Sequence, residues 1–241
     1  LWAKIKRGLS AGRVQSVLFS SSTLTRDLLK KITVISLPLL INEALWSAGM
    51  AMLNQCYSVR GLDVVAAVNI VSTISNVFNV AFISFGSAIG IILSQMLGAG
   101  EKEKAKKAST RLLFFAVVTT FFIAVIMVIF APLFPRIYKT SDEIRTLAAT
   151  LIIVAAVFMP VNSFTNACYF TLRSGGKTVI TFLFDSGFVW TISVPLAFIL
   201  SRFTSVPIVP MYAVILSADI IKCILGYTFM RKGVWLNTVV E

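Results

Sequence analysis

An Asn-Glu pair, Asn42 and Glu43, lies in the middle of the long apolar run 32–57. A charged side chain at the centre of a bilayer helix costs about 2.5–3.5 kcal/mol on insertion scales, so it usually faces a bundle interior or a water-filled cavity. Hydrocarbon favours the protonated carboxyl and a nearby cation favours the carboxylate, so two ions can compete for Glu43. This predicts a coupling site at Glu43 for a proton or Na⁺, with Asn42 able to lend a carbonyl oxygen to a hard cation. The alternative is a structural Glu43 that is protonated or hydrogen-bonded inside the protein.

Polar side chains also recur in two later apolar runs. Four of them share one helix face in the run 64–97, at steps of three and four residues: Asn69, Ser72, Asn76 and Asn79. This pattern indicates either hydrogen bonds between helices or a hydrated stripe that lines a cleft. In the run 144–170, Asn162 and Asn166 follow Pro160 and indicate a second polar-lined stretch.

Charged residues interrupt the last two apolar runs. Asp185 lies about two turns into the run 179–200 and is a further candidate to line a cleft. Asp219 and Lys222 stand one turn apart in the run 206–230, and side chains at this spacing can pair with each other. We expect that pair to account for both residues.

Several kinds of chemistry have no matching residues in this sequence. The chain has no His, the commonest general base and metal ligand. Its three cysteines (Cys56, Cys168 and Cys223) fit neither a disulfide framework nor a zinc spacing. A Walker loop and a nucleophile-base pair are also missing from the sequence. We therefore expect no enzyme activity, no cofactor and no ATP-driven pumping within this chain.

The elements that carry these residues are predicted to be membrane helices. Of the 241 residues, 57% are hydrophobic and 13% are charged, whereas soluble domains have about 25% charged residues. A crossing of the hydrocarbon core takes roughly 20 apolar residues in a helix. Six runs qualify: 32–57, 64–97, 112–131, 144–170, 179–200 and 206–230. The sequence predicts an all-α polytopic membrane protein with six transmembrane helices.

The basic residues predict how the helices are oriented in the membrane. The net charge is +12, but the basic residues punctuate apolar runs and form no basic face for nucleic acid. Sixteen of the 22 Lys and Arg lie in segments on one side, against five in the connections on the other. The positive-inside rule then places both ends in the cytoplasm.

The two end segments are predicted to lie outside the bilayer. Residues 1–31 read as a cytoplasmic linker or the end of a preceding helix, or else as an interfacial helix attracted to anionic lipid. Residues 231–241 read as a cytoplasmic tail. Because the sequence starts at Leu1 and not at Met, we expect it to be a fragment of a longer protein.

Taken in order, these motifs resemble the C-terminal half of the MATE family of multidrug efflux transporters. The resemblance covers about residues 28–236 and depends on the order and spacing of its motifs. They are LPLLINEALWSAGMAMLNQCYSVRG (37–61), VVAAVNI (64–70), GSAIGIILSQMLGAGEKEKAKK (86–107), LRSGGKT (172–178), DSGFVWTISVPLAF (185–198) and the D-x-x-K of the last run.

The resemblance implies one lobe of a twelve-helix transporter in the bacterial plasma membrane. Such a transporter exports cationic amphipathic compounds by alternating access in exchange for Na⁺ or H⁺, and its N-terminal lobe is absent from this chain. In members with a cation site in this lobe, a Glu at the depth of Glu43 takes part with an acidic residue of the tenth helix. No carboxylate occurs in 144–172 here, so Asp185 or Asn162 would have to substitute. The alternatives are a lipid-linked oligosaccharide flippase of the same superfamily and an auxiliary half-transporter.

Overall fold

The protein is described by a computed structural model that covers the backbone of residues 26–176 and 178–236, without the side chains of 26–32, 34–36 and 178. Every regular element in these ranges is a helix, which confirms the predicted all-α class. The chain divides into two units, residues 1–41 and 42–241, and the boundary falls inside the first helix. That helix, α3 (Arg26–Ser58), contains Pro38 in the first unit and the Asn42-Glu43 pair in the second.

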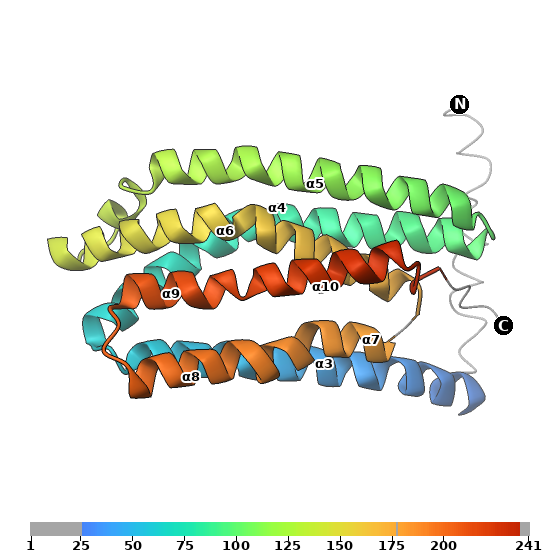
Figure 1. Cartoon of the computed structure of the whole chain (residues 1–241), viewed down its shortest axis with the longest axis horizontal. Coiled ribbons are helices and arrows are strands. Elements are labelled where there is room, and N and C mark those ends of the chain that lie inside the picture. The colour runs from blue at the N-terminus through green and yellow to red at the C-terminus, as the bar shows by residue number, and fades with distance from the viewer. Residues whose placement is uncertain (1–25, 177, 237–241) are drawn as a thin grey trace, which may run out of the picture. The chain divides into compact units, whose positions relative to one another are not determined.

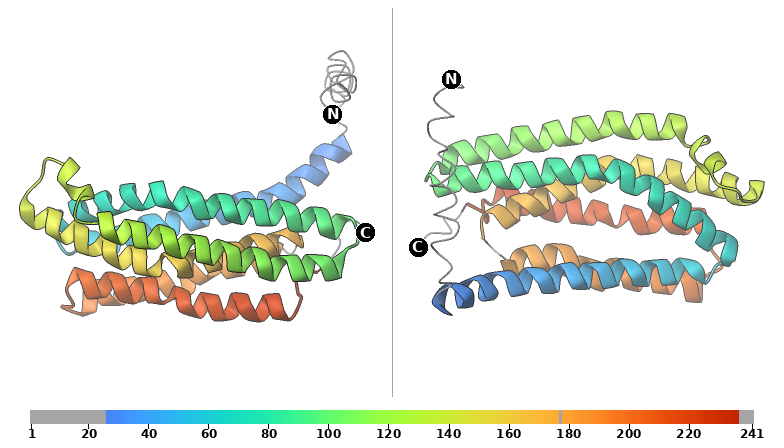
Figure 2. Two further views of the ribbon diagram at one scale, coloured as in Figure 1. Left: turned by 90° about the horizontal axis from the view of Figure 1, so that it is seen from above. Right: turned by 180° about the vertical axis from the view of Figure 1, so that it is seen from behind.

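The second unit is a bundle of helices that run lengthwise beside one another (Figures 1 and 2). After α3 come α4 (Leu62–Gly98) and α5 (Lys102–Phe130). A tight turn joins α3 to α4 at Gly61, whose φ of 117° favours glycine. The helix α5 begins ten residues before the expected apolar run 112–131, because the charged stretch before that run consists of good helix formers.

The helix α6 is the central element of the bundle. A short 3₁₀ turn, η1 (Phe134–Ile137), leads into α6 (Asp142–Ser174), whose first turn is capped by the Ser141 hydroxyl. It packs against α4 along most of its length and also against α5, α9 and α10. Pro160 lies inside it.

The last two crossings are irregular. The first consists of α7 (Thr178–Phe182), two π-helical turns, η2 (Leu183–Gly187) and η3 (Val189–Ser193), and α8 (Val194–Phe203). Pro195 has no amide hydrogen for the carbonyl four positions earlier, which weakens α-helical winding before it. The second crossing is broken at Ala218 into α9 (Ile208–Ser217) and α10 (Asp219–Arg231), where a single helix 206–230 was expected.

Five helical stretches among the described residues are long and apolar enough to cross a bilayer. They are Leu62–Gly98, Lys102–Phe130, Asp142–Ser174, Val179–Phe203 and Ile208–Arg231. The stretch α3, part of whose side chains lie outside the described set, is not among them, so the sixth expected crossing stays a prediction. Of the expected linker 1–31, residues 1–25 lie outside the described residues.

Two apolar clusters fill the bundle. One joins the ends of α3 and α5 to the first halves of α4 and α6 and to α8 and α9. The other joins the second halves of α4 and α6 to the start of α5, and it includes Trp235, which is completely buried after α10. Trp235 and Leu236 therefore pack onto the bundle, and the expectation that 231–241 is a cytoplasmic tail stays a prediction.

Candidate functional site

Asn42 is the centre of a buried polar network. Its side chain is 2% exposed, and its Nδ2 donates to Tyr169 Oη and to Asp185 Oδ2, at 3.4 Å each. The Ser186 hydroxyl lies 2.8 Å from Asn42 Oδ1 and 2.7 Å from the Asn42 carbonyl. Since the Asn42 side-chain carbonyl oxygen is turned toward Ser186, the donor side of the amide faces Tyr169 and Asp185.

Glu43 lies at the exposed edge of the same network. Tyr169 Oη donates to Glu43 Oε1 at 3.2 Å, and Arg173 Nη1 lies 3.9 Å from the same oxygen. The Glu43 side chain is 57% exposed. Its carboxylate can therefore meet an ion or a cationic group from outside the bundle.

Asp185 and Lys222 form the interior end of the network. Lys222 Nζ lies 2.9 Å from Asp185 Oδ1, and the two side chains are only 11% and 15% exposed. The Phe184 and Phe188 rings lie 5.2 Å and 5.9 Å from the ammonium. The expected ion pair between Lys222 and Asp219 is wrong, because the Lys222 side chain reaches across to the π-helical turn instead.

These contacts form one path that joins four elements. It runs through Lys222, Asp185, Asn42, Tyr169, Glu43 and Arg173. Two carboxylates and two basic groups take part, so the path as a whole is neutral. Glu43 and Asp185 are thus connected by hydrogen bonds through Tyr169 and Asn42.

The network reaches the last two turns of α6. Arg173 belongs to the last turn of α6, and Tyr169 lies five residues from the end of this helix, roughly 8 Å at 1.5 Å per residue. The long side chains of Tyr169 and Arg173 reach Glu43 from this end of α6, whereas Glu43 itself lies near the middle of α3 (Arg26–Ser58). The expected depth of Glu43 near the midplane of a bilayer stays a prediction.

The other predicted polar residues lie outside this network. Asn69 and Asn76 are exposed on α4, on the face turned away from the buried residues. Asn162 and Asn166 on α6 are half-buried. Asn166 Oδ1 is buried without a hydrogen-bond partner and lies against Gly86 of α4.

Three members of the network were not singled out from the sequence: Tyr169, Arg173 and Ser186. Tyr169 and Arg173 are four residues apart and share one face of α6. A Tyr hydroxyl in an apolar helix usually needs a polar partner when it is buried. This requirement, together with an Arg one turn later, could have marked Tyr169 and Arg173 as candidate site residues in the sequence.

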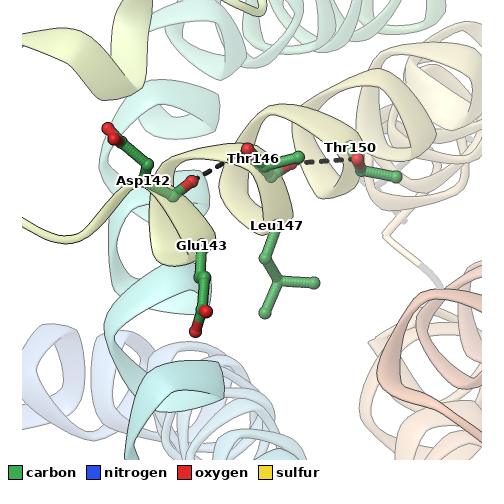
Figure 3. Close-up of a pocket in the computed structure, with 5 residues that line it drawn as sticks. All are labelled: Asp142, Glu143, Thr146, Leu147 and Thr150. Carbon is green, nitrogen blue, oxygen red and sulfur yellow. Dashed lines mark hydrogen bonds between the residues drawn. The ribbon is translucent and has the colours of Figure 1, made fainter.

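A hollow of about 530 Å³ lies elsewhere on the molecule, at the start of α6 (Figure 3). It is lined by Asp142, Glu143, Thr146, Leu147 and Thr150. All five belong to the first turns of one helix, and Thr150 precedes Tyr169 by roughly 29 Å of helix. The hollow therefore belongs to an exposed helix face and not to the network.

A multidentate metal centre finds no support among the side chains described. In residues 26–176 and 178–236, no group of three or more His, Cys, Asp or Glu side chains could hold a metal ion. Around Glu43 Oε1 the neighbours are one hydroxyl and one guanidinium.

Comparison with known sequences gives one family and several relatives. The MatE family model matches residues 38–199. The chain is 26% identical over 175 residues to the probable multidrug resistance protein NorM of Pasteurella multocida (strain Pm70), covering 72% of this chain and 38% of that protein. It is 19% identical over 206 residues to the probable multidrug resistance protein YoeA of Bacillus subtilis (strain 168), covering 86% of this chain and 44% of that protein. The chain spans less than half the length of these relatives.

Solved structures show the same fold. A MATE crystal structure in complex with MaL6 matches with a TM-score of 0.78 at 18% identity, over 88% of this chain and 48% of that one. An outward-facing MATE transporter of the MOP superfamily matches with a TM-score of 0.80 at 18% identity, over 90% and 49%. An inward-facing one matches with a TM-score of 0.74 at 17% identity, over 90% and 50%.

Proposed function

Because the chain belongs to the MatE family, whose model matches residues 38–199, we propose that it is the C-terminal lobe of an ion-coupled exporter of cationic amphipathic compounds. The relatives it matches are described as probable multidrug resistance proteins. The lobe pairs with an N-terminal lobe and lies in the bacterial plasma membrane, in contact with lipid, with both ends cytoplasmic.

The observation that carries the proposal is the Glu43 carboxylate and its two neighbours. The carboxylate is open to the outside on one side and bound by Tyr169 and Arg173 on the other. A carboxylate of this kind can be neutralised by a coupling ion or by a cationic substrate, but not by both together. Mutually exclusive binding at Glu43 is what an antiporter requires.

The surroundings of Glu43 favour a proton over Na⁺ as the coupling ion. Na⁺ prefers several oxygen ligands, and here the Asn42 side-chain oxygen accepts from Ser186. Arg173 lies 3.9 Å from the carboxylate, and its positive charge opposes the binding of a metal cation and of a proton alike, so the number of oxygen ligands decides between them. A proton needs only the carboxylate oxygen.

The flippase alternative is less well supported by the charges. Recognition of a pyrophosphate requires uncompensated basic groups. Within the described network, each basic side chain stands beside a carboxylate, Arg173 beside Glu43 and Lys222 beside Asp185. The paired arrangement favours cationic substrates, which need an acidic group, over anionic ones.

The test uses the complete protein that carries this lobe, reconstituted in vesicles. Export of the cationic dye ethidium is driven by a pH gradient or by a Na⁺ gradient. We expect Glu43→Gln to lower the pH-driven rate at least about tenfold, whereas Glu103→Gln, at the exposed start of α5, retains it. Unchanged export by Glu43→Gln under both gradients would exclude Glu43 as the coupling group.

A further inference from the structure

Lys222 occupies a position that a free monovalent cation could occupy. Its ammonium is held by Asp185 Oδ1 at 2.9 Å, and the faces of Phe184 and Phe188 lie 5.2 Å and 5.9 Å away. Aromatic faces attract cations because of their quadrupole. The side chain thus behaves as a cation that is tethered to α10.

A second carboxylate stands one helical turn from Lys222. Asp219 precedes Lys222 by one turn on α10, and it interacts electrostatically with both Lys222 and Asp185. In the part of the chain that the structure describes, Asp219 has no hydrogen bond or ion pair of its own. One ammonium is thus paired with Asp185 while a second carboxylate stands nearby without a partner of its own, and the three groups carry a net charge of −1 when both acids are ionised.

The backbone is irregular near Asp185 and also just before Asp219. Asp185 lies in the π-helical turn Leu183–Gly187, and the helix that carries Lys222 begins directly after the break at Ala218. Each residue gained or lost between π and α winding rotates the adjoining helix by about 100°. π-Helical turns often mark functional sites, and a change of winding at this turn would rotate Asp185 relative to Lys222.

We propose that Lys222 alternates between Asp185 and Asp219, and that its move to Asp219 leaves Asp185 free to bind a coupling proton. The proton comes from water and forms an O–H bond on Asp185. The three groups then become neutral, which reduces the cost of keeping them out of water. This inference rests on the proposed ion-coupled transport and adds a second proton-binding carboxylate to Glu43.

Other groups face the three residues and contribute to their charge balance. The titratable side chains that interact with them directly are Tyr57, Tyr169 and Cys223, and Glu43 and Arg173 interact in turn with Tyr169. The opposite charges of Glu43 and Arg173 stand together at the far side of Tyr169. They therefore add little net field at Asp185.

The first test is Asp219→Asn in the complete protein, since this change leaves the observed pair between Lys222 and Asp185 in place. We expect ethidium export driven by a pH gradient to fall at least about tenfold and its dependence on external pH to flatten, with the melting temperature retained. The control is Asp142→Asn, whose side chain is 94% exposed at the start of α6. A wild-type rate and pH profile for Asp219→Asn would overturn the proposal.

The second test measures the pairing without transport. Asp219→Asn is made in the parent protein and in Asp185→Asn, and melting temperatures are compared in detergent. We expect little effect in the parent and a drop of about 5 °C or more in Asp185→Asn, because Lys222 then depends on Asp219. If Asp219→Asn changes the melting temperature equally in the parent protein and in Asp185→Asn, Lys222 does not alternate between the two carboxylates.

The two tests separate this inference from the proposed function. If the wild-type protein fails to export ethidium under either gradient, the proposed function is wrong, and the melting experiment still decides the pairing. If Asp185→Asn does not fold, the pH profile of Asp219→Asn decides it.

Discussion

The Lys222 ammonium and the Asp185 carboxylate, 2.9 Å apart, join α10 to the π-helical turn across the interior of the lobe. Both side chains are almost completely buried. Because taking two charges out of water is costly, a buried pair adds little net stability, whereas removal of one partner leaves an uncompensated charge. The pair therefore adds little to the stability of the fold, but a substitution that removes only one of its two charges is expected to be harmful.

Removal of Lys222 alone is expected to be more harmful than removal of the whole pair. Lys222→Met leaves Asp185 buried without its cation and should lower the free energy of unfolding by about 3–5 kcal/mol. The double variant Asp185→Asn/Lys222→Met removes both charges and should recover a large part of this loss. Thermal unfolding of the complete protein in detergent measures both, and a double variant as unstable as Lys222→Met would refute the expectation.

Contact between α4 and α6 depends on Gly86. A Cβ at this position would collide with Asn166 Oδ1 and would lie 2.6 Å from Phe170 Cδ2. Gly86→Ala should therefore cost about 1–3 kcal/mol of stability through overpacking. Gly98→Ala is the matched control in the same helix, because nothing lies within 4 Å of a Cβ there. Equal melting temperatures for the two variants would show that the close approach at Gly86 is unimportant.

The burial of Trp235 depends on the absence of a side chain at Gly175. A Cβ at Gly175 would collide with the backbone of Trp235. We expect Gly175→Ala to displace residues 233–236, and Trp235→Ala to cost about 3–5 kcal/mol through the cavity it leaves. The accessibility of a cysteine at position 236 to a membrane-impermeant thiol reagent reports the displacement. No gain in labelling for Gly175→Ala would contradict the proposed packing.

Arg60 ties the turn between α3 and α4 to the end of α8. Its Nη2 donates to the carbonyls of Leu200 and Thr204, at 2.8 Å and 2.7 Å. Hydrogen bonds from charged donors contribute about 1.5–3 kcal/mol each, so Arg60→Ala should lower the stability by at least about 2 kcal/mol. Arg136→Ala, at an exposed position, serves as the control in the same unfolding measurement. If Arg60→Ala leaves the free energy of unfolding unchanged, the hydrogen bonds from Arg60 do not stabilise the end of α8.

The helices could be predicted from the sequence because apolar runs and breaks are local features. Lys222 shows where this reasoning fails. Spacing along one helix predicts Asp219 as its partner, but the rotation of α10 about its axis is determined by packing against other helices and directs the side chain to Asp185. Asn42 and Glu43 were identified as candidates from their cost in hydrocarbon. Their contacts with Tyr169 depend on two helices whose facing sides no local pattern determines.

The burial of Trp235 could also have been expected from the sequence, although its segment is too short to count as a membrane helix. Residues 231–241 follow the last apolar run, and the sequence predicted a cytoplasmic tail there. A Trp in such a segment has a large apolar surface that favours burial. The structure accommodates it at the end of α6, beside Gly175.

The packing of Trp235 beside Gly175 has a consequence for the order in which the lobe is made. These residues are sixty positions apart in the sequence, and ribosomes add about 5–20 residues per second. The space beside Gly175 therefore stays open for roughly 3–12 s during synthesis, while the last two crossings are still being inserted. Until Trp235 arrives, the end of α6 lacks its cover, so this part of the bundle can be completed only after the last helix has been made.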